Sequence, residues 1–403
     1  MASAPELTQD ESVYAVGVKR ARTVALKAAC VELLMQEERE IRLKRTIWWN
    51  RSLLKRAPSL SSGTGQWRRG KFYGARSNYT RMHAFPLSPA SYYEHFRFTR
   101  EDIPVLTRAL RMPTTIRCGG CVSSGEEALL MYLKRTSFPT RLVDLETFFE
   151  RSITYISEIV EGVRLHLDPI AVKLLLEFDH DRLERSNLYE VFNAAFERKG
   201  CPLADIWSLL DGVFVRFGRP SLDGYRGADQ RAEYNGSKKG HGNNHQGLLT
   251  PDGIFVEMHG PYNGKTNDKK SLRESGLLDR VKKHCIIAGV LYGIFSDSGY
   301  THGDPALQVP VKGPNKTAAE KSYNNTMSKF RVPVEWGFGK IYSLWGYVAY
   351  HKNLRLHSQP VASYWRVAAL LTNCHSCLYG NQTSVYFGVP TPGLFDYLRN
   401  GFY

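Results

Sequence analysis

The chain has 403 residues, a hydrophobic fraction of 42% and a formal net charge of +15, and its sequence pI is near 9.4. This length accommodates two or three domains with a sizeable core, and the excess of positive charge favours a polyanionic partner such as nucleic acid. The chain has no apolar run of about 18 residues and its N-terminus lacks a charged start followed by an apolar core, so we expect neither a membrane span nor secretion.

The N-terminal region, residues 1–100, combines basic and aromatic residues. Its segment from Arg42 to Arg81 contains neither Asp nor Glu. Such a segment can pair with phosphates, stack on bases or serve in nuclear import, with Arg68, Arg69 and Lys71 as candidate DNA contacts. A solvated, partly flexible linker with docked aromatic side chains is an equal alternative, because a charge run is not a site by itself.

Residues 101–175 have helical patterns with short turns between them. The pattern predicts helices over residues 126–134, 142–149 and 153–167. This arrangement is typical of a helix-turn-helix, which would place its last helix in a DNA groove. However, the last helix carries Glu158 and is not basic, so a purely structural three-helix unit is the alternative.

Residues 176–403 change to apolar runs separated by Gly, Asn and Asp. Strands followed by alternating helix and strand predict an α/β architecture with a mixed sheet flanked by helices. The expected strands are residues 209–217, 244–249, 253–259 and 286–295, and the expected helices are residues 269–283, 335–345 and 361–378.

Three acidic residues in this region have settings that suit metal ligands. Asp211 and Asp297 each end an apolar run, and Glu335 lies at the start of an expected helix. Carboxylate oxygens are the donors that Mg²⁺ and Mn²⁺ prefer, and two such ions can clamp a phosphodiester during strand cleavage. Taken singly, each acid is as well explained by a turn, a loop cap or a helix first turn. For the second position, Asp268 and Asp304 are rivals, but only Asp297 directly follows a long expected strand.

Five sequence blocks occur in a characteristic order. They are LDGVFV at 210–215, YNGSKKGH with NHQ at 234–246, GPYNGKTND at 260–268, SDSGY at 296–300 and RVPVEWGFGK at 331–340. Together these blocks resemble the acid-bearing and intervening motifs of PIF/Harbinger-type DDE transposases, over roughly residues 200–380.

The resemblance implies an RNase H-like fold and metal-dependent endonuclease and strand-transfer activity at the terminal inverted repeats of a DNA transposon. It assigns Asp211, Asp297 and Glu335 as the catalytic, metal-binding triad for Mg²⁺ or Mn²⁺. Arg331 and Lys340, which flank the glutamate, become candidate phosphate contacts. The resemblance also implies a nuclear protein that acts on double-stranded DNA, with a Myb-like accessory DNA-binding protein and a homo-oligomeric assembly.

Three departures from the family pattern keep a second interpretation open. Pro333 stands two residues before Glu335, so we expect the helix to begin near Pro333. Asn267 replaces the usual His before Asp268, and Ser296 replaces the usual Gly before Asp297. The alternative is a domesticated DNA-binding or protein-interaction module that keeps the fold and no longer cuts DNA.

The cysteines and histidines form no strong metal motif. The seven cysteines argue against a disulfide framework because their number is odd and they are widely spread. The spacing of Cys118 with Cys121 and of Cys374 with Cys377 is zinc-like, but the pairs lie far apart in sequence, so we expect reduced thiols and keep a composite zinc site as the alternative. The histidines at positions 241, 245 and 259 match no zinc-hydrolase spacing.

Overall fold

The computed structural model describes residues 87–176, 179–220, 228–300, 303–352, 354–356 and 359–402. The basic segment with Arg68, Arg69 and Lys71 lies outside these residues. Within the described part of the chain, no helix is long and apolar enough to cross a membrane.

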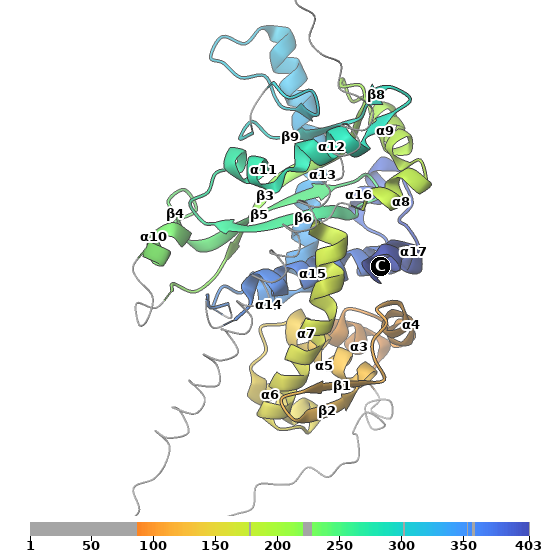
Figure 1. Cartoon of the computed structure of the whole chain (residues 1–403), viewed down its shortest axis with the longest axis vertical. Helices are drawn as coiled ribbons and strands as arrows, with labels where there is room; N and C mark the ends of the chain where they lie inside the picture. The colour runs from red at the N-terminus through yellow and green to blue at the C-terminus, as the bar shows by residue number, and fades with distance from the viewer. Residues whose placement is uncertain are drawn as a thin grey trace, which may run out of the picture. The chain divides into compact units, whose positions relative to one another are not determined.

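The central element is a mixed sheet (Figure 1). Its strands run in the spatial order β6–β5–β3–β9–β10, where β5 is antiparallel to both neighbours and β3, β9 and β10 are parallel to one another. The short strand β4 also pairs with β5. Their bounds are β3 (Ile206–Arg216), β4 (Tyr234–Asn235), β5 (Gly240–Leu249), β6 (Phe255–Asn263), β9 (Gly293–Ser296) and β10 (Leu307–Gln308). The predicted mixed α/β architecture is therefore confirmed.

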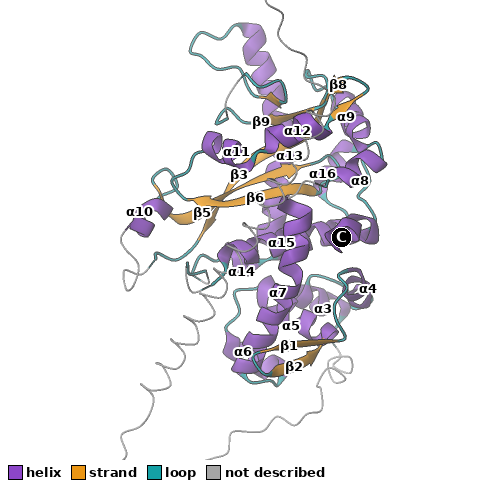
Figure 2. Ribbon diagram, in the orientation of Figure 1, coloured by secondary structure: helices purple, strands orange, loops and turns teal. Residues whose placement is uncertain are grey.

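Helices flank this sheet, as Figure 2 shows. The three that bear on the site are α11 (Asp268–Ser275), α13 (Ala318–Leu344) and α15 (Val361–Tyr379). The other helices of this half are α8 (His180–Arg185), α9 (Leu188–Arg198), α10 (Ala228–Glu233), α12 (Leu277–His284), α14 (Gly346–Ala349), α16 (Gln382–Phe387), α17 (Leu394–Leu398) and the 3₁₀ helix η1 (Arg399–Phe402).

The segment before the sheet is mainly helical, as expected, but it also contains a β-hairpin. Its elements are α3 (Pro89–Phe96), α4 (Asp102–Ala109), β1 (Thr115–Cys118), β2 (Cys121–Ser124), α5 (Gly125–Ser137), α6 (Leu142–Phe149) and α7 (Ile153–Leu176). The helix expected to read DNA is α7, and only its residues Ile153, Thr154 and Pro169 are exposed. A groove-reading helix needs an exposed face, so the structure gives the helix-turn-helix interpretation no support.

Two expected elements are divided in the structure. The strand expected over residues 286–295 is a small hairpin, β7 (Ile286–Ile287) and β8 (Val290–Leu291), followed by β9. Its turn residues Ala288 and Gly289 both have positive φ, which reverses the chain inside an otherwise apolar run. The helix expected over residues 269–283 is likewise broken into α11 and α12, at Gly276 with φ of 64°.

The helix that carries Glu335 begins much earlier than expected. A capping box at Thr317 and Glu320 starts α13, in which each side chain accepts a hydrogen bond from the other residue's backbone N–H. Pro333 lies in the interior of this helix and is buried. The expectation that the helix starts near Pro333 was therefore wrong, because the upstream cap and the packing of α13 outweigh one missing backbone hydrogen bond.

Candidate active site

Asp211 lies within β3, and Asp297 directly follows the neighbouring parallel strand β9. Leu210 of β3 pairs with Ser296 of β9, and each of these residues directly precedes one of the two acids. A nearby backbone N–H holds each carboxylate: the N–H of Gly212 donates to Asp211 Oδ1 at 2.8 Å and that of Gly299 donates to Asp297 Oδ1 at 2.8 Å. The strands that position the two acids are neighbours, as expected, although Asp297 lies one residue beyond the end of β9.

The packing of α13 on β5 explains how Glu335 reaches this part of the sheet. Gly247 of β5 is the cross-strand partner of Asp211, so a side chain at Gly247 would point to the same face as Asp211. A Cβ added at Gly247 would lie 2.8 Å from Phe338 Cζ and 2.9 Å from Phe255 Cε1. The missing side chain thus lets α13 approach the Asp211 face, and Glu335 lies one turn before Phe338 on this helix.

Arg331 links the second and third acids. Its Nη1 donates to Asp297 Oδ2 at 3.3 Å and its Nη2 donates to Glu335 Oε1 at 2.8 Å. Arg331 and Glu335 are one helical turn apart, which is the spacing at which side chains on a helix meet. The expected phosphate contact is therefore brought to the site, where it is paired with two of the three acids.

The carboxyl group of Asp211 has a strongly perturbed pKa. Burial raises its pKa from 3.8 to about 6, and the nearby charges of Asp297 and Glu335 act in the same direction. The Gly212 N–H and the positive charge of Arg331 oppose this rise. Asp297, Glu335 and Arg331 are thus close enough to Asp211 to act on its charge.

A fourth acid, Asp268, lies on the other side of Asp297. A Cβ added at Gly299 would lie 2.8 Å from Asp268 Oδ2 and 2.9 Å from Asp297 Oδ1. Burial raises the pKa of Asp268, and the charge of Asp297 adds to this effect. The side chain of Gln246 helps to hold Asp268 in place. Its Nε2 donates to the backbone carbonyl of Asp268 at 3.3 Å and to the Tyr300 hydroxyl at 3.1 Å.

From the sequence, Asp268 is only a rival candidate for the second acid of the triad. The structure instead places it next to Asp297, as a fourth acid beside the three of the triad. Its membership of one of the five sequence blocks was the available signal. Asp304, the other rival, instead forms an ion pair with Lys282, with 2.5 Å between Asp304 Oδ2 and Lys282 Nζ.

The donor chemistry of the site fits a hard divalent cation, because every acid there offers carboxylate oxygens. In the part of the chain that the structure describes, however, no three acidic, histidine or cysteine side chains are already gathered closely enough to hold an ion. Arg331 supplies positive charge between Asp297 and Glu335 instead. Metal binding thus requires the contacts of Arg331 to change and the carboxylates to turn towards one another.

Lys340, the second expected phosphate contact, points away from the acids. Its ammonium group donates to Ser376 Oγ at 2.9 Å and to the Gly380 carbonyl at 2.7 Å. Burial lowers the pKa of Lys340 to about 8. The structure therefore gives Lys340 a place in the packing of α13 against the end of α15, and does not bring it to the other site residues.

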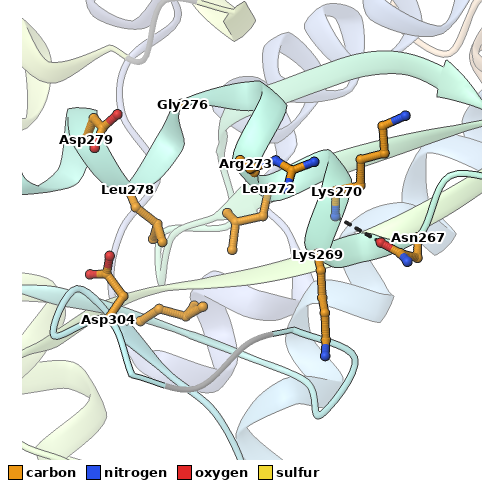
Figure 3. Close-up of a pocket in the computed structure, with 10 residues that line it drawn as sticks. Asn267, Lys269, Lys270, Leu272, Arg273, Gly276, Leu278, Asp279 and Asp304 are labelled. Atoms are coloured by element: carbon orange, nitrogen blue, oxygen red, sulfur yellow. Dashed lines mark hydrogen bonds between the residues drawn. The ribbon is translucent and has the colours of Figure 1, made fainter.

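A pocket of about 690 Å³ lies along α11 and α12 (Figure 3). Its basic side chains, Lys269, Lys270 and Arg273, all come from α11, and Asp279 and Asp304 also line it. None of the triad acids lines this pocket. The helix α11 that lines it begins with Asp268, the acid that lies next to Asp297.

The cysteines and histidines of the zinc hypotheses have other surroundings. Cys118 and Cys121 face each other across the β1–β2 hairpin, and the Cys118 thiol lies 3.6 Å from Glu158 Oε2. Cys374 and Cys377 are on α15, where burial raises the pKa of both thiols. His245 is fully buried, and burial lowers its pKa to about 3.

Comparison with known families agrees with the position of the acids. Residues 210–373 match the family model of the DDE superfamily endonucleases. No curated protein and no solved structure matches this chain. The matched segment starts one residue before Asp211 and includes Asp297 and Glu335, so all three acids lie in the part of the chain that is similar to DDE superfamily endonucleases.

Proposed function

We propose that this protein is a PIF/Harbinger-type transposase or transposase-derived nuclease that cuts and joins DNA at terminal inverted repeats. The observation that carries the proposal is the placement of Asp211 beside Asp297 on parallel strands, with Glu335 on the helix that packs against the same sheet face. The strand order and the antiparallel position of β5 support the RNase H-like fold that the sequence resemblance implies.

In this proposal Asp211, Asp297 and Glu335 hold Mg²⁺ or Mn²⁺. The bound ions would activate water or a 3′-hydroxyl and stabilise the negative charge that develops on the phosphate. The chain's own part is to hold the carboxylates in place, through the backbone N–H groups of Gly212 and Gly299. Since the pKa of Asp211 is about 6, this carboxyl group is mostly ionised at neutral pH and available as a ligand.

The proposed substrate is double-stranded DNA at the transposon ends and at the target. Support comes from the net charge of +15, and Arg68, Arg69 and Lys71 are proposed contacts outside the described residues. A Myb-like accessory protein, a homo-oligomeric assembly and a nuclear location complete the proposal on the basis of the family resemblance.

The domesticated module remains a second candidate, which the departure at Ser296 favours. Two of the sequence departures, in contrast, have local structural roles. The Asn267 side chain caps α11 by accepting from the Lys270 N–H at 2.9 Å, and α13 continues through Pro333. These two departures therefore no longer weigh against activity.

Replacing Asp297 with Asn tests the proposal. Asn keeps the size of the side chain and removes the charge that would hold the ion. A bound ion contributes several kcal/mol to the stabilisation of the transition state in such reactions. We expect Mg²⁺-dependent cleavage of an inverted-repeat DNA end to fall by a factor on the order of 10³, while DNA binding stays the same or becomes slightly tighter.

The matched control is Asp304→Asn, which removes an acid paired with Lys282 and should leave cleavage unchanged. The assay includes wild-type protein and the Myb-like partner. Equal cleavage by wild type and Asp297→Asn would remove Asp297 from the metal site. A wild type that binds the DNA and never cuts it would favour the domesticated module.

A further inference from the structure

Arg331 is placed where a metal ion would have to compete with it. Its guanidinium group makes one ion pair of 3.3 Å with Asp297 and one of 2.8 Å with Glu335, and its charge also lowers the pKa of Asp211. The side chain thus acts on all three triad acids at once. Without a cation between them, these acids would repel one another.

The ion pairs and metal binding exclude each other in part. An oxygen that accepts a charge-assisted hydrogen bond from a guanidinium group is turned towards that group, and a bound divalent ion would place a second positive charge close to it. A divalent ion that uses Asp297 and Glu335 must therefore loosen or break the contacts of Arg331.

Arg331 can leave the acids without disturbing the fold. Its side chain is 33% exposed, and that of Glu335 is 52% exposed. Phe330 and Val334, which lie before and after Arg331 within one turn of α13, are buried and hold the helix in place. The motion therefore requires a change of side-chain rotamer and no movement of the helix. A released guanidinium group is a strong, bidentate ligand for phosphate.

We propose that Arg331 is the internal counter-ion of the metal-free site. It positions Asp297 and Glu335, is displaced when a divalent ion binds, and then binds a phosphate of the DNA. Metal and DNA binding consequently favour each other, because each ligand removes a contact that opposes the other. This inference rests on the proposed metal-dependent function and adds a role for Arg331 to it.

The test is Mn²⁺ binding to the full chain without DNA, measured by electron paramagnetic resonance for wild type, Arg331→Gln and Arg331→Lys. Removing the competing charge should tighten Mn²⁺ binding in Arg331→Gln by on the order of fivefold, the scale of a partly exposed ion pair. Arg331→Lys keeps the charge and should stay near wild type. The matched control is Lys329→Gln, which removes one positive charge at an exposed position of the same helix and should change little.

A second measurement examines the coupling to DNA. Wild type should bind an inverted-repeat duplex more tightly with Ca²⁺ than with EDTA, and Arg331→Gln should lose most of this gain. Structural damage to the site would weaken both ligands, whereas the inference requires tighter Mn²⁺ binding together with a smaller effect of the metal on DNA affinity.

Asp297→Asn separates the two levels of the argument. If wild type binds Mn²⁺, Asp297→Asn does not, and Arg331→Gln binds no more tightly than wild type, the role of Arg331 is overturned and the metal site stands. An equal gain in Arg331→Gln and Lys329→Gln would also overturn it, because general electrostatics would then suffice. If wild type and every variant fail to bind Mn²⁺, the proposed function and this inference both fall.

Discussion

Asp211 carries a carboxylate that the fold makes costly to ionise. Burial is the main cause of the rise of its pKa from 3.8 to about 6, and the neighbouring acids add to it. Groups that are perturbed by burial together with specific charge partners occur frequently at functional sites. A metal ion would relieve this cost, since it supplies positive charge next to the buried carboxylate.

The cost leads to a prediction for Asp211→Asn in the absence of metal. Because the pKa is higher in the folded than in the unfolded protein, ionisation destabilises the fold increasingly as the pH rises from about 4 to 6, and the penalty stays constant above that range. Below pH 4 the group is protonated in both states and the penalty is absent. We expect Asp211→Asn to raise the free energy of unfolding at pH 8 by up to about 3 kcal/mol, and to abolish cleavage.

Urea unfolding in EDTA at pH 8 and at pH 3.5 measures this effect. The stabilisation should be present at the higher pH and nearly absent at the lower one. A variant that is less stable than wild type at pH 8 would show that the hydrogen bond from Gly212 to the carboxylate contributes more than its desolvation costs.

The contact between α13 and β5 sets where Glu335 lies. It depends on Gly247, because a Cβ there would come within 2.8 Å of the Phe338 ring. Gly339, next to Phe338 on α13, is exposed, and a Cβ added there has no heavy atom within 4 Å. Gly247 therefore has no room for a side chain, whereas Gly339 does.

At this scale we predict opposite effects of two alanine substitutions. Gly247→Ala should lower the free energy of unfolding by about 1–3 kcal/mol through overpacking, and should weaken Mn²⁺ binding because α13 moves away from Asp211. Gly339→Ala should raise it by roughly 0.5–1 kcal/mol, since alanine is a better helix former than glycine. Thermal unfolding with and without Mn²⁺ checks both; equal effects would show that α13 adapts freely.

The whole chain carries a net charge of +15, and much of its basic character lies in the N-terminal third. If the segment from Arg42 to Arg81 follows the DNA backbone, it contributes counter-ion release that does not depend on the DNA sequence. In that case the N-terminal region supplies much of the affinity for DNA, separately from the segment that carries the three acids.

Replacing Arg68, Arg69 and Lys71 together with Ala tests this division. Each phosphate contact that is lost should reduce the salt dependence of DNA affinity by roughly one unit of slope, for specific and unrelated duplexes alike. The measurement is the dissociation constant as a function of salt concentration. An unchanged slope would mean that this segment is a linker. The control replaces three exposed arginines of the described residues with Ala, which gives the same change of charge: Arg108 on α4, Arg117 on β1 and Arg198 on α9.

Local patterns determined the nature of the elements well where the signal was continuous. The helices near residues 142–149 and 361–378 and the strands at Asp211 and in the 244–259 region follow from apolar periodicity and turn residues, and the structure has them. The errors came from interruptions that packing decides. A two-residue turn folds the first part of the run before Asp297 into the β7–β8 hairpin, and Pro333 remains inside a helix that is capped far upstream.

From the sequence alone follow the α/β class, the three acids and the family resemblance, because residue type and order along the chain carry that information. Only the tertiary structure decided which other side chains accompany the acids. Arg331 turns towards Asp297 and Glu335, Asp268 arrives beside Asp297 from α11, and Lys340 turns inward to Ser376. The reason is that these contacts join residues from separate elements, and their distances depend on how β3, β9, α11, α13 and α15 pack, which no local pattern specifies.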